Sequence, residues 1–130
     1  MAMEQTTLRV GIKAEVERTF TEADIAEFNS LVSANIGNEV PEPLIAGMFS
    51  FLLGEELPGF GTNYLKQRMQ FKAVAEPGEA LVTSVEVSRI RADKDLVDLN
   101  TLCTGRDGRV ICEGSALVLA KDTNWTLEES

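Results

Sequence analysis

The chain of 130 residues carries a formal net charge of −9, which argues against nucleic-acid binding because phosphate contacts need an excess of Lys and Arg. Its composition, with 44% hydrophobic and 25% charged residues, is typical of one soluble globular domain. The longest apolar run, Pro43 to Gly54, is too short to span a membrane and the first residues lack the features of a signal peptide, so we expect a cytoplasmic protein without a membrane partner.

The beginning of the chain predicts a strand followed by a helix. Apolar and polar residues alternate from Thr7 to Thr19, which is the pattern of a half-buried strand. Thr21 is a typical helix N-cap, and the apolar residues at helical spacing after it predict an amphipathic helix from Thr21 to Ala34. We expect Asn35 and Gly37 to end this helix.

A second helix is predicted over Leu44 to Leu53. This segment is apolar almost all round, which predicts a helix that is buried on every side. Gly54 suits the end of this helix as a C-cap, and the proline and glycines that follow predict a turn-rich connection.

The second half of the chain predicts four strands separated by turn signals at Pro77-Gly78, Asp93-Lys94 and Asp107-Gly108. Residues 122 to 130 are polar apart from Trp125 and Leu127, and we expect them to fray. The expected strands run from Thr62 to Val74, Leu81 to Ile90, Leu96 to Thr104 and Val110 to Lys121.

This order of elements predicts an antiparallel sheet wrapped around one buried helix, the α+β arrangement known as the hot-dog fold. We expect residues 1 to 121 to form this single domain and residues 122 to 130 to form a polar C-terminal tail. A long exposed sheet edge is a liability in a monomer, so we also expect two copies to pair as a homodimer.

The chain contains no histidine, which excludes any Ser-His, Cys-His or Asp-His mechanism built from this chain alone. Cys103 and Cys112 flank a predicted turn, so they can be cross-strand neighbours, and reduced core cysteines are favoured in a cytosolic chain. Two cysteines without a histidine make a poor zinc site, so we expect no metal.

Segments from most of the chain carry, in their order and spacing, a resemblance to a known family. They are Phe20 to Phe28, Leu52 to Leu65, Phe71, Pro77-Gly78, Arg91 to Lys94 and Cys103 to Leu119. Together they resemble the MaoC-like, (R)-specific enoyl-CoA hydratases over residues 8 to 121. The resemblance implies a hot-dog protein of fatty acid metabolism that binds an acyl-CoA or acyl-carrier thioester, with coenzyme A as part of the substrate and no covalently bound cofactor.

In that family an Asp-x-Asn-Pro-x-His loop activates a water, and a backbone N–H at a His-Gly-Met helix start holds the thioester oxygen. Here the loop is shortened to Asn35 to Pro41 and contains neither Asp nor His. Counting back from Leu57-Pro58-Gly59 places the start of the central helix at Val40 to Pro43, so that Pro41 and Glu42 replace the His-Gly.

Three residues near this helix start are candidates for catalysis. Glu42 can serve as a general base, or it can simply interact with the dipole at the helix N-terminus. Glu39 and Asn38 can orient a water, or they can shape a turn.

Five further residues are candidates for binding. Ser50 falls where the family has a pocket serine, so it can line an acyl tunnel or bond to its own helix backbone. Asn35 can also contact substrate or end the first helix, and Met48 is expected in the core or in a tunnel wall. Lys66 and Arg68 alternate along one strand face, where they can meet the phosphates of coenzyme A or of a carrier arm, or lie in solvent.

These residues leave three hypotheses for the function. The first is an enzyme, either an enoyl-thioester hydratase or dehydratase with a non-standard site, or a thioesterase that uses Glu42. The second is a non-catalytic acyl-thioester binding protein or the partner subunit of a chain that carries the histidine. The third is a structural or regulatory hot-dog protein without a thioester ligand.

Overall fold

The computed structural model describes residues 7–32 and 39–129. The elements follow in this chain order: β1 (Thr7–Leu8), β2 (Lys13–Thr19), α1 (Glu22–Leu31), α2 (Glu42–Phe51), the π-helical segment η1 (Leu52–Glu56), β3 (Asn63–Phe71), β4 (Ala80–Arg91), the 3-10 turn η2 (Ala92–Lys94), β5 (Leu96–Thr104), the 3-10 turn η3 (Arg106–Gly108), β6 (Val110–Leu119) and β7 (Thr126–Leu127).

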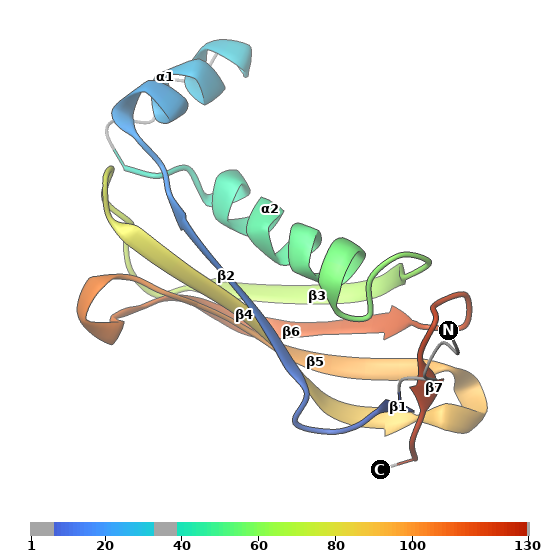
Figure 1. Ribbon diagram of the computed structural model, residues 1–130. Helices are drawn as coiled ribbons and strands as arrows, with labels where there is room; N and C mark the ends of the chain where they lie inside the picture. Colours follow the sequence, from blue (N-terminus) through green and yellow to red (C-terminus); the bar gives the residue numbers. More distant parts are fainter. Residues whose placement is uncertain (1–6, 33–38, 130) are drawn as a thin grey trace, which may run out of the picture.

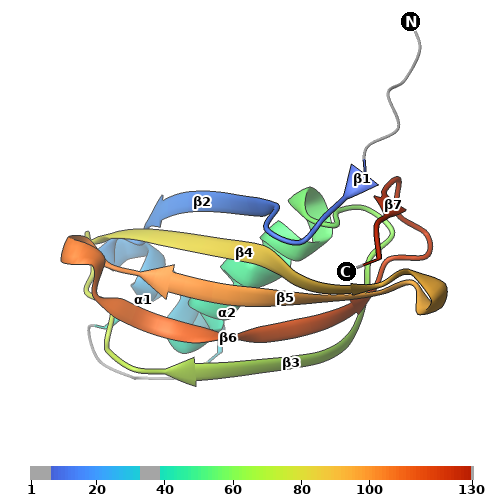
Figure 2. The ribbon, with the colours of Figure 1, turned by 90° about the horizontal axis from the view of Figure 1, so that it is seen from below.

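Five strands form one sheet in the order β2-β4-β5-β6-β3, and every neighbouring pair is antiparallel. The helix α2 lies across one face of this sheet, which we call the inner face (Figure 1). No described element covers the opposite, outer face (Figure 2). The predicted α+β hot-dog arrangement is therefore confirmed, with β2 and β3 as the two sheet edges.

The core lies between α2 and the inner face of the sheet. Helical spacing brings Ile45, Met48 and Phe49 onto the buried side of α2. Phe49 is fully buried, and burial of such a side chain stabilises a fold by about 1.5–3 kcal/mol. Alternate residues of the central strands supply the facing side of the core: Val85, Val87, Leu99, Thr101 and Cys103.

The prediction that α2 is buried on every side is wrong for the described chain. The sheet covers one side of α2 only, so Phe51 keeps 47% of its surface exposed and Gly47 and Ser50 are exposed as well. An apolar helix surface that faces away from the sheet is unusual in a monomer. Neither α2 nor any other described helix is long and apolar enough to cross a membrane.

Gly54 does not end the helix as predicted. The chain continues through η1, where the Leu57 N–H donates to the Leu52 carbonyl at 2.7 Å. Leu52 and Leu53 are fully buried within this segment, and continued winding keeps both side chains in the core. Burial of two leucines therefore outweighs the local preference of glycine for a helix end.

The first helix begins as predicted. The Asp24 N–H donates to the Thr21 hydroxyl at 3.1 Å, and the Thr21 N–H donates to the Asp24 carboxylate at 2.9 Å, which completes a capping box. The described helix ends at Leu31, and Asn35 and Gly37 lie outside the described residues. Its predicted apolar face is only partly packed, because Ile25 is buried whereas Leu31 is 78% exposed.

The N-terminal strand is broken rather than continuous. Gly11 adopts a φ of 97°, which glycine tolerates and other residues rarely do, and the turn there separates β1 from β2. β1 leaves the main sheet and pairs in parallel with β7 of the C-terminal segment. Trp125 also donates from its indole nitrogen to the Pro58 carbonyl at 2.8 Å, so the prediction that this segment frays is wrong.

Candidate functional site

A pocket at the N-terminus of α2 brings together two of the predicted acidic residues. Glu39 and Glu42 both line it, and its volume is about 280 Å³. We call it the Glu42 pocket. Two carboxylates beside an apolar wall can bind a water and present it to an apolar substrate. The apolar part of the wall comes from Val40, Pro41, Pro43, Ile45, Phe71, Ala73, Val74 and Ala75.

The start of α2 shapes the pocket. Pro41 is the N-cap and Pro43 lies in the first turn, where a fixed φ and a missing N–H are tolerated. The Leu44 N–H donates to the Pro41 carbonyl at 3.0 Å. The Glu42 N–H is therefore the first-turn donor that can meet a ligand. The helix begins where the count back from Leu57-Pro58-Gly59 placed it, which confirms that prediction.

Two backbone carbonyls on the opposite wall are fixed by hydrogen bonds. The Val40 N–H donates to the Ala75 carbonyl at 2.9 Å, which joins the two sides of the pocket. The Arg109 guanidinium donates to the Val74 carbonyl at 3.1 Å and to the buried carboxylate of Glu79 at 2.8 Å. The wall after β3 is therefore held by the hairpin between β5 and β6 as well as by its own strand.

The two cysteines are buried in the sheet below α2, and the negative charge of Glu42 affects the pKa of one of them. Burial raises the pKa of the Cys112 thiol to about 11, and the charges of Cys103, Glu42 and Glu113 add to this effect. Burial also raises the pKa of the Cys103 thiol. The two cysteines are direct cross-strand partners, free and fully buried, as the sequence suggested.

We therefore expect both thiols to resist alkylation in the folded protein, because the reactive thiolate is scarce and solvent access is blocked. Ellman's reagent should report almost no free thiol at neutral pH, and two thiols per chain after unfolding in guanidinium. Rapid labelling of the native protein would contradict the buried arrangement.

Ser50 and Met48 lie away from the Glu42 pocket. Ser50 is exposed about 12 Å along α2 from Glu42, and its carbonyl accepts a hydrogen bond from the Tyr64 hydroxyl at 3.1 Å. Met48 is buried against the sheet, where its sulfur accepts from the hydroxyl of Thr83 in β4 at 3.4 Å. The structure does not bring either residue into contact with the carboxylates.

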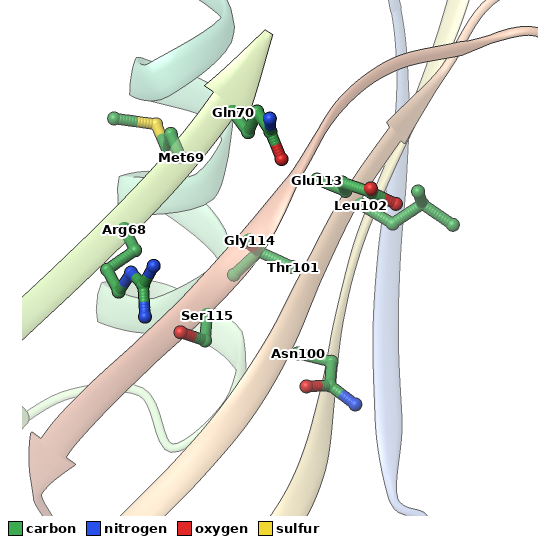
Figure 3. Close-up of a pocket in the computed structure, with 9 residues that line it drawn as sticks. All are labelled: Arg68, Met69, Gln70, Asn100, Thr101, Leu102, Glu113, Gly114 and Ser115. Carbon is green, nitrogen blue, oxygen red and sulfur yellow. The ribbon is translucent and has the colours of Figure 1, made fainter. Parts of the chain in front are cut away.

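The strand register places Lys66 and Arg68 on the outer face of β3, opposite Leu117 and Ser115 of β6. Arg68 lines an open depression of about 740 Å³ on the sheet (Figure 3). The Glu42 pocket lies on the helix side, so the sheet edge at β3 separates these cations from the carboxylates. The other residues around the depression are Met69, Gln70, Asn100, Thr101, Leu102, Glu113, Gly114 and Ser115.

Asn35 and Asn38 lie outside the described residues, so their predicted roles stay predictions. The apolar wall after β3 and the ion pair between Glu79 and Arg109 were not predicted. The wall had a weak signal, since Phe71 and Ala73 alternate with Lys72 at strand spacing. The ion pair had none, because its members are 30 residues apart and each is ordinary in its local sequence.

Comparison with known proteins shows which family the chain belongs to. No family model matches the chain. The (R)-specific enoyl-CoA hydratase of Aeromonas caviae is 33% identical over 131 residues, which cover 89% of this chain and 98% of that protein. The chain belongs to the (R)-specific enoyl-CoA hydratase family. The family enzyme of Rhodospirillum rubrum is 29% identical, over 86% of this chain and 88% of its own.

A solved structure of the same family agrees with this assignment. The (R)-hydratase from A. caviae involved in PHA biosynthesis superimposes with a TM-score of 0.79 at 31% identity, covering 85% of this chain and 96% of that one. Membership of the (R)-specific enoyl-CoA hydratase family confirms the resemblance seen in the sequence. This member contains no histidine, and the acidic groups of the Glu42 pocket are the carboxylates of Glu39 and Glu42.

Proposed function

We propose that the protein binds an enoyl or 3-hydroxyacyl thioester in the Glu42 pocket and interconverts the two by adding or removing water. The observation that carries this proposal is the meeting of Glu39 and Glu42 in one pocket at the N-terminus of the central helix. Family membership supports the substrate class, because the relative with 33% identity is named an (R)-specific enoyl-CoA hydratase. Coenzyme A enters as part of the substrate, and no covalently bound cofactor is needed.

In the hydration direction, Glu42 accepts a proton from water while the water oxygen forms a bond to C3 of the enoyl group. The electron pair of the C2–C3 double bond moves towards the thioester, whose oxygen accepts a hydrogen bond from the Glu42 N–H. C2 then takes a proton from the protonated carboxyl group, which restores the carboxylate. Glu39 holds the water on the same side of the pocket. The product is the 3-hydroxyacyl thioester, and the reverse sequence is the dehydration.

The direct test is incubation of the purified protein with crotonyl-CoA while the absorbance of the enoyl thioester is followed. We expect this absorbance to fall at an initial rate proportional to protein concentration. Mass spectrometry should identify the product as 3-hydroxybutyryl-CoA. An absorbance that stays constant at high protein concentration would refute the hydratase proposal.

A thioesterase is the second candidate, because a glutamate that activates water can direct it at the thioester carbonyl instead of at C3. That reaction would form a carboxylic acid and release the free thiol of coenzyme A. Ellman's reagent distinguishes the two reactions, since hydration leaves the thioester bond intact. Thiol release from saturated butyryl-CoA would favour the thioesterase.

A non-catalytic binding subunit is the third candidate, and the observation in its favour is the complete absence of histidine. It predicts that crotonyl-CoA binds without turnover in isothermal titration calorimetry. It also predicts that activity appears when a histidine-bearing hot-dog chain is added.

We further propose that two copies pair along β3 into a homodimer. This edge strand carries apolar side chains that a monomer leaves in water: Leu65 is 53% exposed and Met69 is 39% exposed. An unpaired strand edge with exposed apolar residues is the usual signature of strand addition.

Asp substitutions at Leu65 and Met69 are expected to shift the protein from dimer to monomer in size-exclusion chromatography with light scattering. Two carboxylates per edge introduce charge repulsion and the cost of burying charge in the interface. The matched control is Val10→Asp, an exposed apolar position in the turn before β2. A wild-type protein that elutes as a monomer would refute the homodimer.

Lys66 and Arg68, on the outer face of β3, are proposed to meet the phosphates of coenzyme A. Opposite charges within a Debye length strengthen binding in a salt-dependent way. The double variant Lys66→Glu with Arg68→Glu is expected to raise the KM for crotonyl-CoA about tenfold and to leave the KM for crotonyl-pantetheine unchanged. An equal effect on both thioesters would show that these cations do not contact the nucleotide.

A further inference from the structure

We infer that Arg109 is a positioning residue of the Glu42 pocket. Its guanidinium pairs with the buried carboxylate of Glu79 and donates a hydrogen bond to the Val74 carbonyl in the pocket wall. This inference rests on the proposed function, and it assigns a role to a residue that touches neither of the proposed catalytic carboxylates. The Glu79 side chain, which pairs with Arg109, is completely buried and lies outside the hydrophobic core cluster.

The Glu79 carboxylate is a fixed point between two loops. It accepts hydrogen bonds from the Glu76 N–H at 2.9 Å and from the Arg106 N–H at 2.7 Å. The Arg109 guanidinium donates to its two oxygens at 2.8 and 2.9 Å. Hydrogen bonds to a charged group are short and about twice as strong as neutral ones, so this cluster holds the turn before β4 against the hairpin between β5 and β6.

Arg109 extends this fixed point to the pocket. The same guanidinium nitrogen that contacts Glu79 also donates to the Val74 carbonyl at 3.1 Å. Val74 and Ala75 form the wall of the Glu42 pocket opposite the helix start. The Ala75 carbonyl in turn accepts from the Val40 N–H at 2.9 Å, two residues before Glu42. Both sides of the pocket are therefore connected to Glu79.

Stability alone would not require this arrangement. A buried ion pair is often no more stabilising than well-packed apolar residues of similar size. An apolar replacement could hold the two loops together, but it could not donate to the Val74 carbonyl. The Arg109 guanidinium therefore fixes the position of the wall at Val74, and this position determines where a thioester lies relative to the Glu42 carboxylate.

The test compares two double variants in the full chain. The first, Glu79→Met with Arg109→Met, removes both charges together so that neither is left buried without a partner. The matched control, Arg91→Met with Asp98→Leu, removes another partly buried ion pair with a 3.0 Å contact at the other end of β4 and β5. A third variant, Glu79→Gln, keeps the Arg109 donor and keeps the fold testable if the double variant unfolds.

We expect the first double variant to lower kcat for crotonyl-CoA about 10- to 100-fold with little change in KM, because a small displacement of the reacting groups is costly. The control pair should keep kcat within about twofold, and Glu79→Gln should lie between them. Hydrogen exchange provides a readout that does not depend on turnover. The Val40 amide should exchange at least about tenfold faster in the first variant, while the Val87 amide in the sheet should not change.

Equal losses of kcat in the two double variants would overturn the inference, because they would reflect general destabilisation. An unchanged exchange rate at Val40 would overturn it whatever the activity. If the wild-type protein does not turn over crotonyl-CoA, the proposed function fails, and calorimetric binding of crotonyl-CoA replaces kcat. Weaker binding in the first variant alone, together with faster exchange at Val40, would then still support the positioning role.

Discussion

Replacement of Glu42 by glutamine is expected to lower kcat for hydration of crotonyl-CoA by about 100- to 10,000-fold, which is the usual contribution of a general base. Glutamine keeps the size of the side chain and its ability to accept a hydrogen bond, but it cannot take a proton from water. Glu42 is exposed at the first residue of α2, so the fold should remain intact. Loss of the interaction with the helix dipole should cost only about 0.3–1 kcal/mol.

Glu55→Gln is the matched control, since Glu55 is also an exposed glutamate at the other end of the same helical run. It removes one negative charge from the chain without touching the pocket, so kcat should stay within about twofold. Glu39→Gln should reduce kcat less than Glu42→Gln, because Glu39 holds the water and does not carry the proton. If Glu42→Gln changes stability alone and leaves kcat intact, Glu42 serves only the helix dipole and the hydratase proposal loses its base.

The fold could be predicted because its signals are local and repeated. Alternation of apolar and polar residues located four long strands, and the turn signals between them fixed their ends to within a few residues. Thr21 and Asp24 carry their capping box within four residues, so the start of α1 could be found in the same way. The start of α2 could be predicted from its distance along the chain to Leu57-Pro58-Gly59, and the structure has the helix begin there.

The sequence-based predictions were wrong where segments distant in sequence contact one another. Gly54 favours a helix end locally, but burial of Leu52 and Leu53 keeps the chain wound beyond it. Trp125 looked like an isolated apolar residue in a polar tail, whereas its indole bonds to a carbonyl 67 residues earlier. Periodicity also showed that α2 is apolar all round without showing that the sheet covers only one of its sides. Tertiary contacts decided each of these features, and no short sequence window contains them.

The same limit applies to the candidate site. Glu39 and Glu42 could be found because they are close in sequence at a helix start, whereas the wall that faces them comes from the end of β3. Lys66 and Arg68 were correctly placed on one strand face, but only the register with β6 shows that this face lies opposite the helix. The anchor of the wall, Glu79 with Arg109, joins two loops 30 residues apart.

Removal of the guanidinium in Arg109→Ala is expected to destabilise the fold by about 3 kcal/mol, because it leaves the Glu79 charge buried without its ionic partner. The value lies at the low end for a buried pair, since the Arg109 side chain is 41% exposed whereas that of Glu79 is 0% exposed. Urea denaturation at neutral pH measures the loss. Arg9→Ala is the control, because the Arg9–Glu128 pair is exposed and should contribute less than about 1 kcal/mol.

The pH dependence of stability tests the same carboxylate. Burial alone would raise the pKa of Glu79, but hydrogen bonds from the Glu76 N–H, Arg109 and the Arg106 N–H outweigh it and hold the pKa below its ordinary value of 4.5. A lowered pKa in the folded state stabilises the protein fully above pH 4.5, and this contribution is lost as the pH falls through the folded value. The stability difference between wild type and Glu79→Gln should therefore be largest near neutral pH and shrink below about pH 4.5. Other carboxylates titrate in both proteins and cancel in this difference, so a gap that stays constant down to about pH 3 would show that Glu79 is not held as a buried carboxylate.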